Sequence, residues 1–348
     1  MKVAILSPVA WRTPPRHYGP WEQIASNIAE GLVNLGVDVS LFATGDSVTS
    51  GKLFAVCDTG YEEDKSQDAK VLECIHISNL MEMAPEFDII HNNFDFLPLT
   101  YSGLIKTPVI TTIHGFSSPK IIPVYKKYNA NNHYVSISNA DRSPELDYIA
   151  TVYNGLNTMH FIFNDEPEEY LLYFGRIHPD KGTAEAIEIA KKSKRKLIIA
   201  GLIQDERYFK EMIEPQLNGQ IKYVGNAEPG KRNDLLGKAA ALLHPISFNE
   251  PFGMSVAEAM LCGTPVIAFN RGSMPELIND GMTGFLVTNI DEAVEAVTQI
   301  KIISRDDCRN WAKSQFSTEK MVSDYLALYK QILTQPEPAG QAINSILP

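Results

Sequence analysis

At 348 residues the chain is longer than a single hydrophobic core usually supports, which predicts two domains. Its 44% hydrophobic and 21% charged residues are typical of a folded globular protein rather than a disordered one. The formal net charge of −11 excludes a general nucleic-acid-binding protein, because nothing global attracts phosphate backbones. Any anionic ligand therefore requires a local basic pocket.

Nothing in the sequence predicts export or insertion into a membrane. Residues 1–6 are too short for the apolar region of a signal peptide, and no stretch approaches the roughly 18 apolar residues of a membrane span. The cysteines are scattered without a C-x-x-C pair, as is typical of reduced thiols. We therefore expect a cytoplasmic protein, with peripheral membrane contact and a homodimer left open. The cysteines are Cys57, Cys74, Cys262 and Cys308.

The first half of the chain alternates predicted strands and helices. A buried strand over 3–6 leads into a polar, aromatic loop over 7–20, and a helix with apolar residues at helical spacing follows until Gly36. This order is typical of an α/β domain with a parallel sheet. The helical repeat is Ile24, Ile28, Leu32 and Leu35, and later strands are predicted at 37–43, 88–91, 109–113 and 133–137.

The same alternation restarts after residue 165 and predicts a second doubly wound domain. We expect an N-terminal domain over 1–162, a C-terminal domain over 163–317 that begins with an acidic hinge, and a tail over 334–348. A closing helix at 318–333 needs a surface to pack on, in its own domain or in the other one. The second domain is predicted to contain strands 170–174, 196–201, 221–225, 241–245 and 265–269 and helices 183–193, 206–217, 232–240 and 254–262.

Two doubly wound domains place the loops that follow their strands around a central cleft. One such loop puts Arg176 and Lys181 five residues apart, between a strand and a helix. A guanidinium grips a phosphate with two N–H groups, an ammonium acts as a point charge, and a helix N-terminus adds partial positive charge. We expect this loop to bind a phosphate or diphosphate; the alternative is a solvated basic loop.

Gly19 precedes the first helix, where a glycine allows close approach of backbone and anion, although a plain turn fits equally well. The residues around it do not form G-x-G-x-x-G, and the chain has no G-x-x-x-x-G-K-[ST] segment. Neither a dinucleotide-binding fingerprint nor a P-loop is therefore predicted.

Glu250 and Glu258 flank a Pro-Phe-Gly turn in the block 244–269. Two carboxylates suggest acid/base chemistry, a metal site or hydroxyl binding, but no D-x-D pattern or cluster of His and carboxylate residues accompanies them. Ionised carboxylates accept paired hydrogen bonds from a sugar diol, whereas Glu258 alone could simply favour a helix N-terminus. Together with the basic loop, they fit a diphosphate between two polyols, which describes a nucleotide sugar.

His114 follows the predicted strand 109–113 and would face the cleft. A lone histidine often only satisfies a core or turn hydrogen bond, so a structural and a functional role stay open.

In these motifs the chain resembles the retaining, nucleotide-sugar-dependent glycosyltransferases of family 4, which have the two-domain GT-B fold. The resemblance covers residues 1–330 and rests on "TIHGF", "VSISNA", "VYNGLNTMHF", "LLYFGRIHPDKG" and "LIIAG". Its most specific block is "EPFGMSVAEAMLCGTPVIAFNRGSMPELINDGMTGFLV", with the E-x7-E spacing of Glu250 and Glu258. It implies a donor site in the second domain, an acceptor site in the first, and a closing helix that crosses back to the first.

The resemblance also implies roles for single residues. Arg176 and Lys181 would contact the donor diphosphate, Glu258 the ribose and Glu250 the transferred sugar, with His114 near the reacting centre. The implied catalytic contacts are thus Arg176, Lys181, Glu250 and His114. The resemblance implies no nucleophile and no metal. The full implied donor set is Gly19, Gly175, Arg176, Lys181, Gly201, Val224, Asn226, Glu250, Phe252, Gly253, Met254, Ser255 and Glu258.

The acceptor is encoded less clearly. Many members of the family carry Gly-Gly before the first helix, whereas here the second position is Pro20, which has no N–H to offer. The aromatic loop before this helix could stack on a sugar, or its rings could pack beneath the loop. Because residues 22–35 contain no Lys or Arg, we expect a sugar or another small soluble acceptor. The candidate acceptor contacts are Trp11, Arg16, His17, Tyr18, Asn92 and Asp95.

The sequence thus predicts a metal-independent, retaining hexosyltransferase that uses a UDP- or GDP-sugar and binds neither nucleic acid nor a cofactor. A sugar phosphorylase or a nucleotide-sugar epimerase of the same architecture is the alternative, and a non-catalytic nucleotide-sugar-binding protein is the third interpretation.

Overall fold

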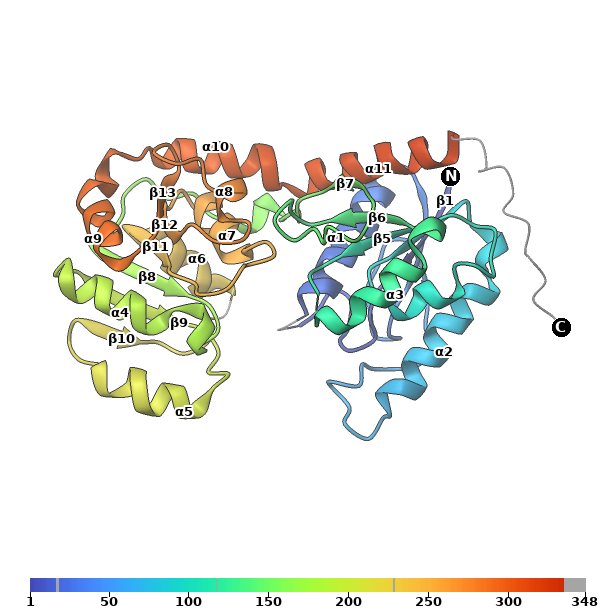
Figure 1. Cartoon of the computed structure of the whole chain (residues 1–348), viewed down its shortest axis with the longest axis horizontal. Helices are drawn as coiled ribbons and strands as arrows, with labels where there is room; N and C mark the ends of the chain where they lie inside the picture. Colours follow the sequence, from blue (N-terminus) through green and yellow to red (C-terminus); the bar gives the residue numbers. More distant parts are fainter. Residues whose placement is uncertain (17–18, 117, 228, 335–348) are drawn as a thin grey trace. The chain divides into compact units, whose positions relative to one another are not determined.

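The computed structural model describes residues 1–16, 19–116, 118–227 and 229–334 (Figure 1). Contacts between Cα atoms divide the chain into two compact units. The first unit contains Met1–Thr112, Ser118–Tyr134 and the chain from Val322 on. The second unit contains Val135–Met321 and a short segment that starts at Ile113.

A seven-stranded sheet carries the strands of the first half, in the order β3-β2-β1-β4-β5-β6-β7. Its central strand β1 (Lys2–Leu6) pairs in parallel with β2 and β4, so that Val3 lies beside Val39 and Ile89. Val3–Leu6 are all buried, as expected for a parallel strand that is covered on both faces. The other strands are β2 (Asp38–Phe42), β3 (Lys52–Phe54), β4 (Ile89–Asn92), β5 (Val109–Ile113), β6 (His133–Ser136) and β7 (Tyr148–Thr151).

The helices of the first half follow the sequence only in part. Helix α1 (Pro20–Asn34) buries Ile24, Ile28 and Leu32 as predicted, but it ends before Leu35, which is exposed. Helix α2 (Ala69–Glu82) was not predicted, because its buried face includes the polar His76 while the apolar Val71 and Ile75 are exposed, so no apolar face stands out in its sequence. The short helix α3 covers Ile122–Lys127.

A six-stranded sheet with the order β10-β9-β8-β11-β12-β13 forms the centre of the second unit, and all its neighbouring strands are parallel. The predicted α/β class and the second parallel sheet are therefore confirmed. Its strands are β8 (Tyr170–Phe174), β9 (Lys196–Ala200), β10 (Ile221–Tyr223), β11 (Ala241–His244), β12 (Val266–Phe269) and β13 (Gly284–Val287). Its helices are α4 (Thr183–Lys192), α5 (Glu206–Tyr208), α6 (Pro229–Lys238), α7 (Met254–Leu261), α8 (Met274–Leu277), α9 (Ile290–Gln299) and α10 (Arg305–Phe316).

The helix predicted over 206–217 is interrupted. After α5 the chain forms a π-helical turn at Phe209–Ile213 and a 3-10 turn at Glu214–Gln216. Pro215 lies in the last turn and has no N–H to continue an α-helical ladder, which is why the regular helix breaks here.

Helix α11 (Thr318–Thr334) returns to the first unit from Val322 on, as predicted for the closing helix; Figure 1 draws it in red. The Tyr329 hydroxyl lies 2.6 Å from His91 Nδ1, and His91 Nε2 lies 2.7 Å from Thr112 Oγ1. The Tyr325 hydroxyl in turn lies 2.6 Å from Thr112 Oγ1. Because all four side chains are buried, this chain of hydrogen bonds satisfies polar groups that would otherwise cost folding energy.

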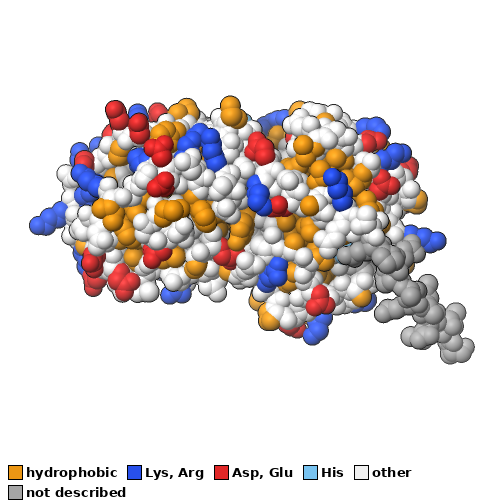
Figure 2. Space-filling view, turned by 90° about the horizontal axis from the view of Figure 1, so that it is seen from above, with side chains coloured by type: hydrophobic (Ala, Val, Ile, Leu, Met, Phe, Trp, Pro, Cys, Tyr) orange, Lys and Arg blue, Asp and Glu red, His pale blue; other side chains and the backbone are white. Residues whose placement is uncertain are grey.

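The surface seen in Figure 2 carries interspersed acidic and basic side chains. Within residues 1–16, 19–116, 118–227 and 229–334, no helix has the length and apolarity needed to cross a membrane.

Candidate functional site

Two loops at the carboxyl ends of neighbouring strands β8 and β9 lie backbone against backbone. Gly201 has a φ of 148°, and a Cβ there would lie 1.8 Å from the carbonyl oxygen of Gly175, so only glycine fits. The Ile177 N–H also donates to the Leu202 carbonyl at 2.8 Å. These contacts hold the loop that carries the two predicted cations in one position.

Arg176 leaves this loop half-buried, and its guanidinium donates to the side-chain oxygen of Gln204 in the loop after β9. The partner is neutral, so the positive charge of Arg176 is oriented by Gln204 without being compensated by it.

Lys181 and Glu250 meet at the ends of β8 and β11, although 69 residues separate them in sequence. Lys181 Nζ lies 2.6 Å from Glu250 Oε2, and both side chains are only 13% exposed. Lys181 Nζ also lies 4.5 Å from the ring centre of Phe248. The structure thus brings two of the predicted site residues into one ion pair, in which Glu250 compensates the charge of Lys181.

His244, the last residue of β11, lies beside this pair and was not predicted. Its Nε2 is 3.8 Å from Glu250 Oε2. Burial lowers the pKa of His244 to about 4, so the ring is neutral at physiological pH and adds no positive charge. Its place at the end of a strand, the signal that drew attention to His114, could have identified it.

The start of helix α7 follows directly after Glu250. Gly253 precedes the helix with a φ of 95°, in the left-handed region that favours glycine. Phe252 is buried, while Met254 and Ser255 of the first turn are half-buried. The predicted glycine-opened helix start is therefore present next to the Lys181–Glu250 pair.

Glu258 lies one turn into α7 and is buried, with 7% of its surface exposed. Burial raises the pKa of its carboxyl group, and the guanidinium of Arg232 opposes this shift. Arg232 Nη1 lies 3.2 Å from Glu258 Oε1 and comes from α6. Sequence reasoning missed Arg232, because its pairing depends on which helices are neighbours.

Two further predicted donor contacts, Val224 and Asn226, follow β10. The Val224 N–H donates to the Ile199 carbonyl at 3.0 Å, and the Gly201 N–H donates to the Gly225 carbonyl at 3.0 Å. Asn226 is exposed at the end of this segment. These backbone bonds place the segment beside the Gly201 loop.

His114 follows β5 and belongs to the short segment that groups with the second unit. Burial lowers the pKa of His114 to about 3, so the imidazole is neutral at physiological pH. A Cβ at the adjacent Gly115 would lie 3.2 Å from Pro251 Cγ. The segment that carries His114 therefore contacts the loop that carries Glu250.

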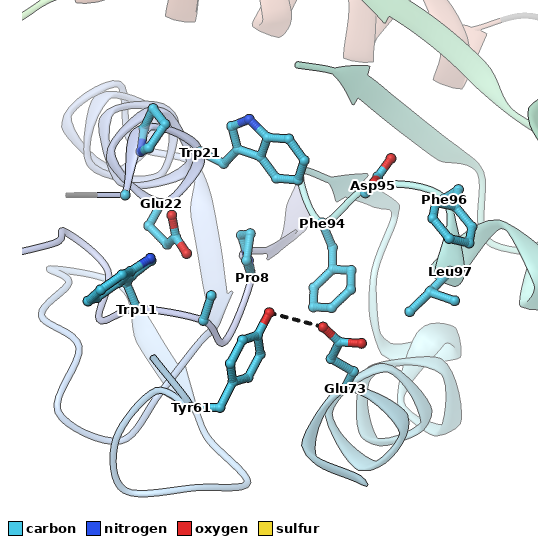
Figure 3. Close-up of a pocket in the computed structure, with 13 residues that line it drawn as sticks. Pro8, Trp11, Trp21, Glu22, Tyr61, Glu73, Phe94, Asp95, Phe96 and Leu97 are labelled. Carbon is cyan, nitrogen blue, oxygen red and sulfur yellow. Dashed lines mark hydrogen bonds between the residues drawn. The ribbon is translucent and has the colours of Figure 1, made fainter. Parts of the chain in front are cut away.

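The first unit contains a pocket of ≈ 460 Å³, shown in Figure 3. Two predicted acceptor contacts, Trp11 and Asp95, line it, and so does Gly19, which was predicted as a donor contact. Glu22, Tyr61 and Glu73 line it too, and none of them was predicted. The full lining is Pro8, Ala10, Trp11, Gly19, Pro20, Trp21, Glu22, Tyr61, Glu73, Phe94, Asp95, Phe96 and Leu97.

Asp95 is held at this pocket in an unusual backbone conformation, with a φ of 106°. Asn92 Nδ2 donates to the Asp95 carbonyl at 2.8 Å, and the Tyr125 hydroxyl donates to its carboxylate. Burial is the main cause that raises the pKa of Asp95 to about 6. Asn92 therefore supports Asp95 without lining the pocket itself.

Arg16, a further predicted acceptor contact, is not among the residues that line this pocket. Arg16 pairs instead with Asp46 at 2.9 Å and with Glu63 at 2.8 Å. His17 and Tyr18 lie outside the residues that the structure describes.

Glu22 is the most buried acid of the pocket, with 3% of its surface exposed. Its carboxyl group accepts hydrogen bonds from backbone N–H groups, including that of Trp11, yet burial raises its pKa to about 7. Its position on the buried face of α1, with Ser26, is a sequence signal that could have found it. Glu73 accepts a hydrogen bond from the Tyr61 hydroxyl at 3.1 Å, and burial raises its pKa as well.

Among the described residues, no group of three or more His, Cys, Asp or Glu side chains is arranged to hold a metal ion.

Comparisons with known proteins agree with this architecture. Residues 157–316 match the family "Glycosyl transferases group 1". An uncharacterized glycosyltransferase of Methanocaldococcus jannaschii is 23% identical over 82% of this chain and 85% of its own length. D-inositol 3-phosphate glycosyltransferase of Mycolicibacterium smegmatis is 28% identical over 60% of this chain and 53% of its own.

The solved structure of Anabaena HepE in complex with UDP and glucose superposes with a TM-score of 0.71 at 19% identity, over 95% of this chain and 100% of that one. The chain therefore has the GT-B fold.

Proposed function

We propose, from the premise that residues 157–316 form a group 1 glycosyltransferase domain, that this chain is a retaining, metal-independent hexosyltransferase. It moves a hexosyl group from a UDP- or GDP-sugar to a hydroxyl group of a sugar or another small acceptor. The donor binds at the strand-end loops of the second unit and the acceptor at the pocket of the first. The complexes of HepE with UDP and with UDP-glucose support a nucleotide-sugar donor.

The observation that carries this proposal is the Lys181–Glu250 pair. An ammonium group 2.6 Å from a carboxylate, with both side chains 13% exposed, is a compensated charge at the edge of a site. A diphosphate that enters this site can replace the carboxylate as the partner of Lys181, and Glu250 is then free to accept hydrogen bonds from sugar hydroxyls. Arg176, whose side chain is oriented by neutral Gln204, supplies a second cation.

This arrangement stabilises the charges that develop during transfer. As the bond between sugar and phosphate breaks, negative charge grows on the leaving diphosphate and positive charge on the anomeric carbon. Lys181, Arg176 and the start of α7 stabilise the first of these. The acceptor hydroxyl attacks from the face of departure, so the configuration is retained and the leaving phosphate takes the proton.

The neutral imidazole of His114 and the buried carboxyl group of Glu258 both have a place in this mechanism. His114, with a pKa of about 3, contributes a hydrogen bond near the transferred sugar and no charge. Glu258 binds the ribose hydroxyls, and its ion pair with Arg232 opposes the rise in pKa that burial causes.

A donor screen tests the proposal. The purified chain is incubated with UDP- and GDP-sugars, with and without a mixture of sugar acceptors, in EDTA and then in Mg²⁺. We expect free UDP or GDP to appear with acceptor, at equal rates in both buffers, and NMR of the product to show the anomeric configuration of the donor.

Three outcomes would overturn parts of this proposal. Turnover that requires Mg²⁺ contradicts metal independence, and an inverted product contradicts retention. A donor that is epimerised without any acceptor contradicts transfer altogether.

A further inference from the structure

The pocket of the first unit carries information about the acceptor, provided that the proposed function, on which this assignment rests, is correct. Its volume of ≈ 460 Å³ is in the range of small-molecule sites. All of its lining residues belong to the first unit, so its chemistry is set within that unit.

Aromatic rings border much of the space. Figure 3 shows Trp11, Trp21, Tyr61 and Phe94 around the pocket, with Phe96 at one side. Flat apolar rings of this kind pack against the C–H faces of a sugar or cyclitol ring while its hydroxyls turn toward polar groups.

The polar groups of the lining are acids. Glu22, Glu73 and Asp95 each contribute a carboxyl group, and the described lining contains no Lys, Arg or His. Arg16, the arginine among the predicted acceptor contacts, does not line the pocket and forms ion pairs with Asp46 and Glu63. A phosphate or carboxylate in this pocket would meet acids that repel it once they are ionised, and no cation among the described lining residues compensates its charge.

We infer that this pocket selects an acceptor ring without phosphate or carboxylate groups, and that Glu22 and Glu73 are residues that determine this specificity. Their carboxyl oxygens bind the hydroxyls of a neutral ring and repel an anionic one. The acceptor is thus an unphosphorylated sugar or cyclitol, at least in the ring that enters the pocket.

Glu22 is suited both to binding ring hydroxyls and to repelling an anionic ring. It is held by backbone N–H groups, so its carboxyl group has a fixed direction. A carboxyl group that titrates near neutrality can accept a hydrogen bond from a ring hydroxyl when ionised and donate one when protonated. Its charge, and with it the repulsion of anions, decreases as the pH falls below about 7.

Binding of matched pairs tests the inference directly. The full chain is titrated at pH 8 with glucose and glucose 6-phosphate, mannose and mannose 6-phosphate, and myo-inositol and inositol 3-phosphate. Tryptophan fluorescence reports on the pocket, because Trp11 and Trp21 are two of the three tryptophans of the chain. We expect at least one neutral member to bind about tenfold or more tightly than its phosphorylated partner.

Two conservative variants and a control test whether Glu22 and Glu73 cause the preference for a neutral ring over its phosphorylated partner. Glu22→Gln and Glu73→Gln should each reduce the preference by about threefold or more, since each removes one negative charge with little change of shape. Glu86→Gln removes an exposed charge outside the pocket and should leave it unchanged. The preference of the unaltered chain should also decrease between pH 8 and pH 5.5.

A phosphorylated member that binds as tightly as its neutral partner overturns the inference, and so does a panel in which no neutral ring binds. The result is separable from the proposed function, because binding is measured without turnover. Selective binding of a neutral ring by a chain that never releases UDP or GDP would contradict the proposed transfer and support the pocket assignment.

Discussion

The two candidate sites differ in how their acidic side chains are compensated. In the second unit Glu250 pairs with Lys181 and Glu258 pairs with Arg232, so each carboxylate has a cation. In the first-unit pocket, Glu73 and Asp95 are held by tyrosine hydroxyls and Glu22 by backbone N–H groups. No cation is among the described residues that line that pocket.

This difference has a physical consequence. An ion pair at the edge of a site can exchange its carboxylate for an anionic ligand without leaving the cation uncompensated. Burial raises the pKa values of Glu22 and Asp95, no cation among the described residues of the pocket lining opposes this shift, and both acids repel anions once ionised. The second unit is therefore suited to a phosphorylated ligand and the first to a neutral one, and four changes test this contrast.

The largest effect is expected for Lys181→Ala. Loss of a group that stabilises a leaving diphosphate typically lowers the rate by about 10²–10³. Release of UDP or GDP in the presence of acceptor measures it, and circular dichroism checks that the variant is folded. Lys192→Ala, which removes an exposed partner of Glu188 and Asp291, is the control and should keep full turnover. Full turnover of Lys181→Ala would contradict its assigned role.

The next largest effect concerns Glu22 and pH. Its folded-state pKa is raised from 4.5 to about 7, so the folded chain retains a proton that the unfolded chain releases in this window. Stability therefore falls as pH rises from 4.5 to 7, by on the order of 3 kcal/mol for the full shift.

Glu22→Gln removes this penalty. Its unfolding free energy, measured in urea, should exceed that of the unaltered chain at pH 8 and match it at pH 4.5, while Glu86→Gln shows no such change. If Glu22→Gln is less stable than the unaltered chain at pH 8, the ionised Glu22 carboxylate stabilises the folded state and the expected penalty is wrong.

A smaller effect on stability is expected for Glu250→Gln. It leaves Lys181 at 13% exposure without its carboxylate, which should lower the free energy of unfolding by about 1–3 kcal/mol. The midpoint of urea unfolding measures this loss, and addition of UDP or GDP should recover part of it through the phosphates. Glu188→Gln, at an exposed pair, is the matched control. An unchanged midpoint would mean that the pair contributes nothing to the folded state.

The smallest effect is expected for Arg16→Ala. The sequence names Arg16 as an acceptor contact, but its guanidinium is 47% exposed and pairs with two acids away from the pocket lining. Exposed pairs contribute little, so the KM for the acceptor should change by less than about twofold. A tenfold rise in that KM would return Arg16 to the acceptor site.

Features that depend on the local sequence pattern, such as single strands and the loops after them, could be predicted. Strand β8 was predicted with the bounds found, because a parallel strand buried on both faces has a continuous apolar run. Loops that follow such strands were singled out, and Lys181 and Glu250 lie in loops after β8 and β11. Their pairing was not predicted, because it depends on β11 lying next to β8, and strand order is absent from the local pattern.

The first-unit pocket was predicted only in part for the same reason. Trp11 and Asp95 follow β1 and β4, whereas Tyr61 and Glu73 come from a loop and a helix without a sequence signal. Helix α2 has no clear apolar face, so neither its existence nor the direction of Glu73 could be inferred.

The hydrogen bond between His91 and Tyr329 joins residues 238 positions apart in the chain. A ribosome completes the whole second unit before it adds the residues that satisfy His91 and Thr112 in the first. The unit that begins the chain is thus the last to reach its final packing. A nascent chain that stops before residue 322 leaves those buried groups without α11, whatever the state of the second unit.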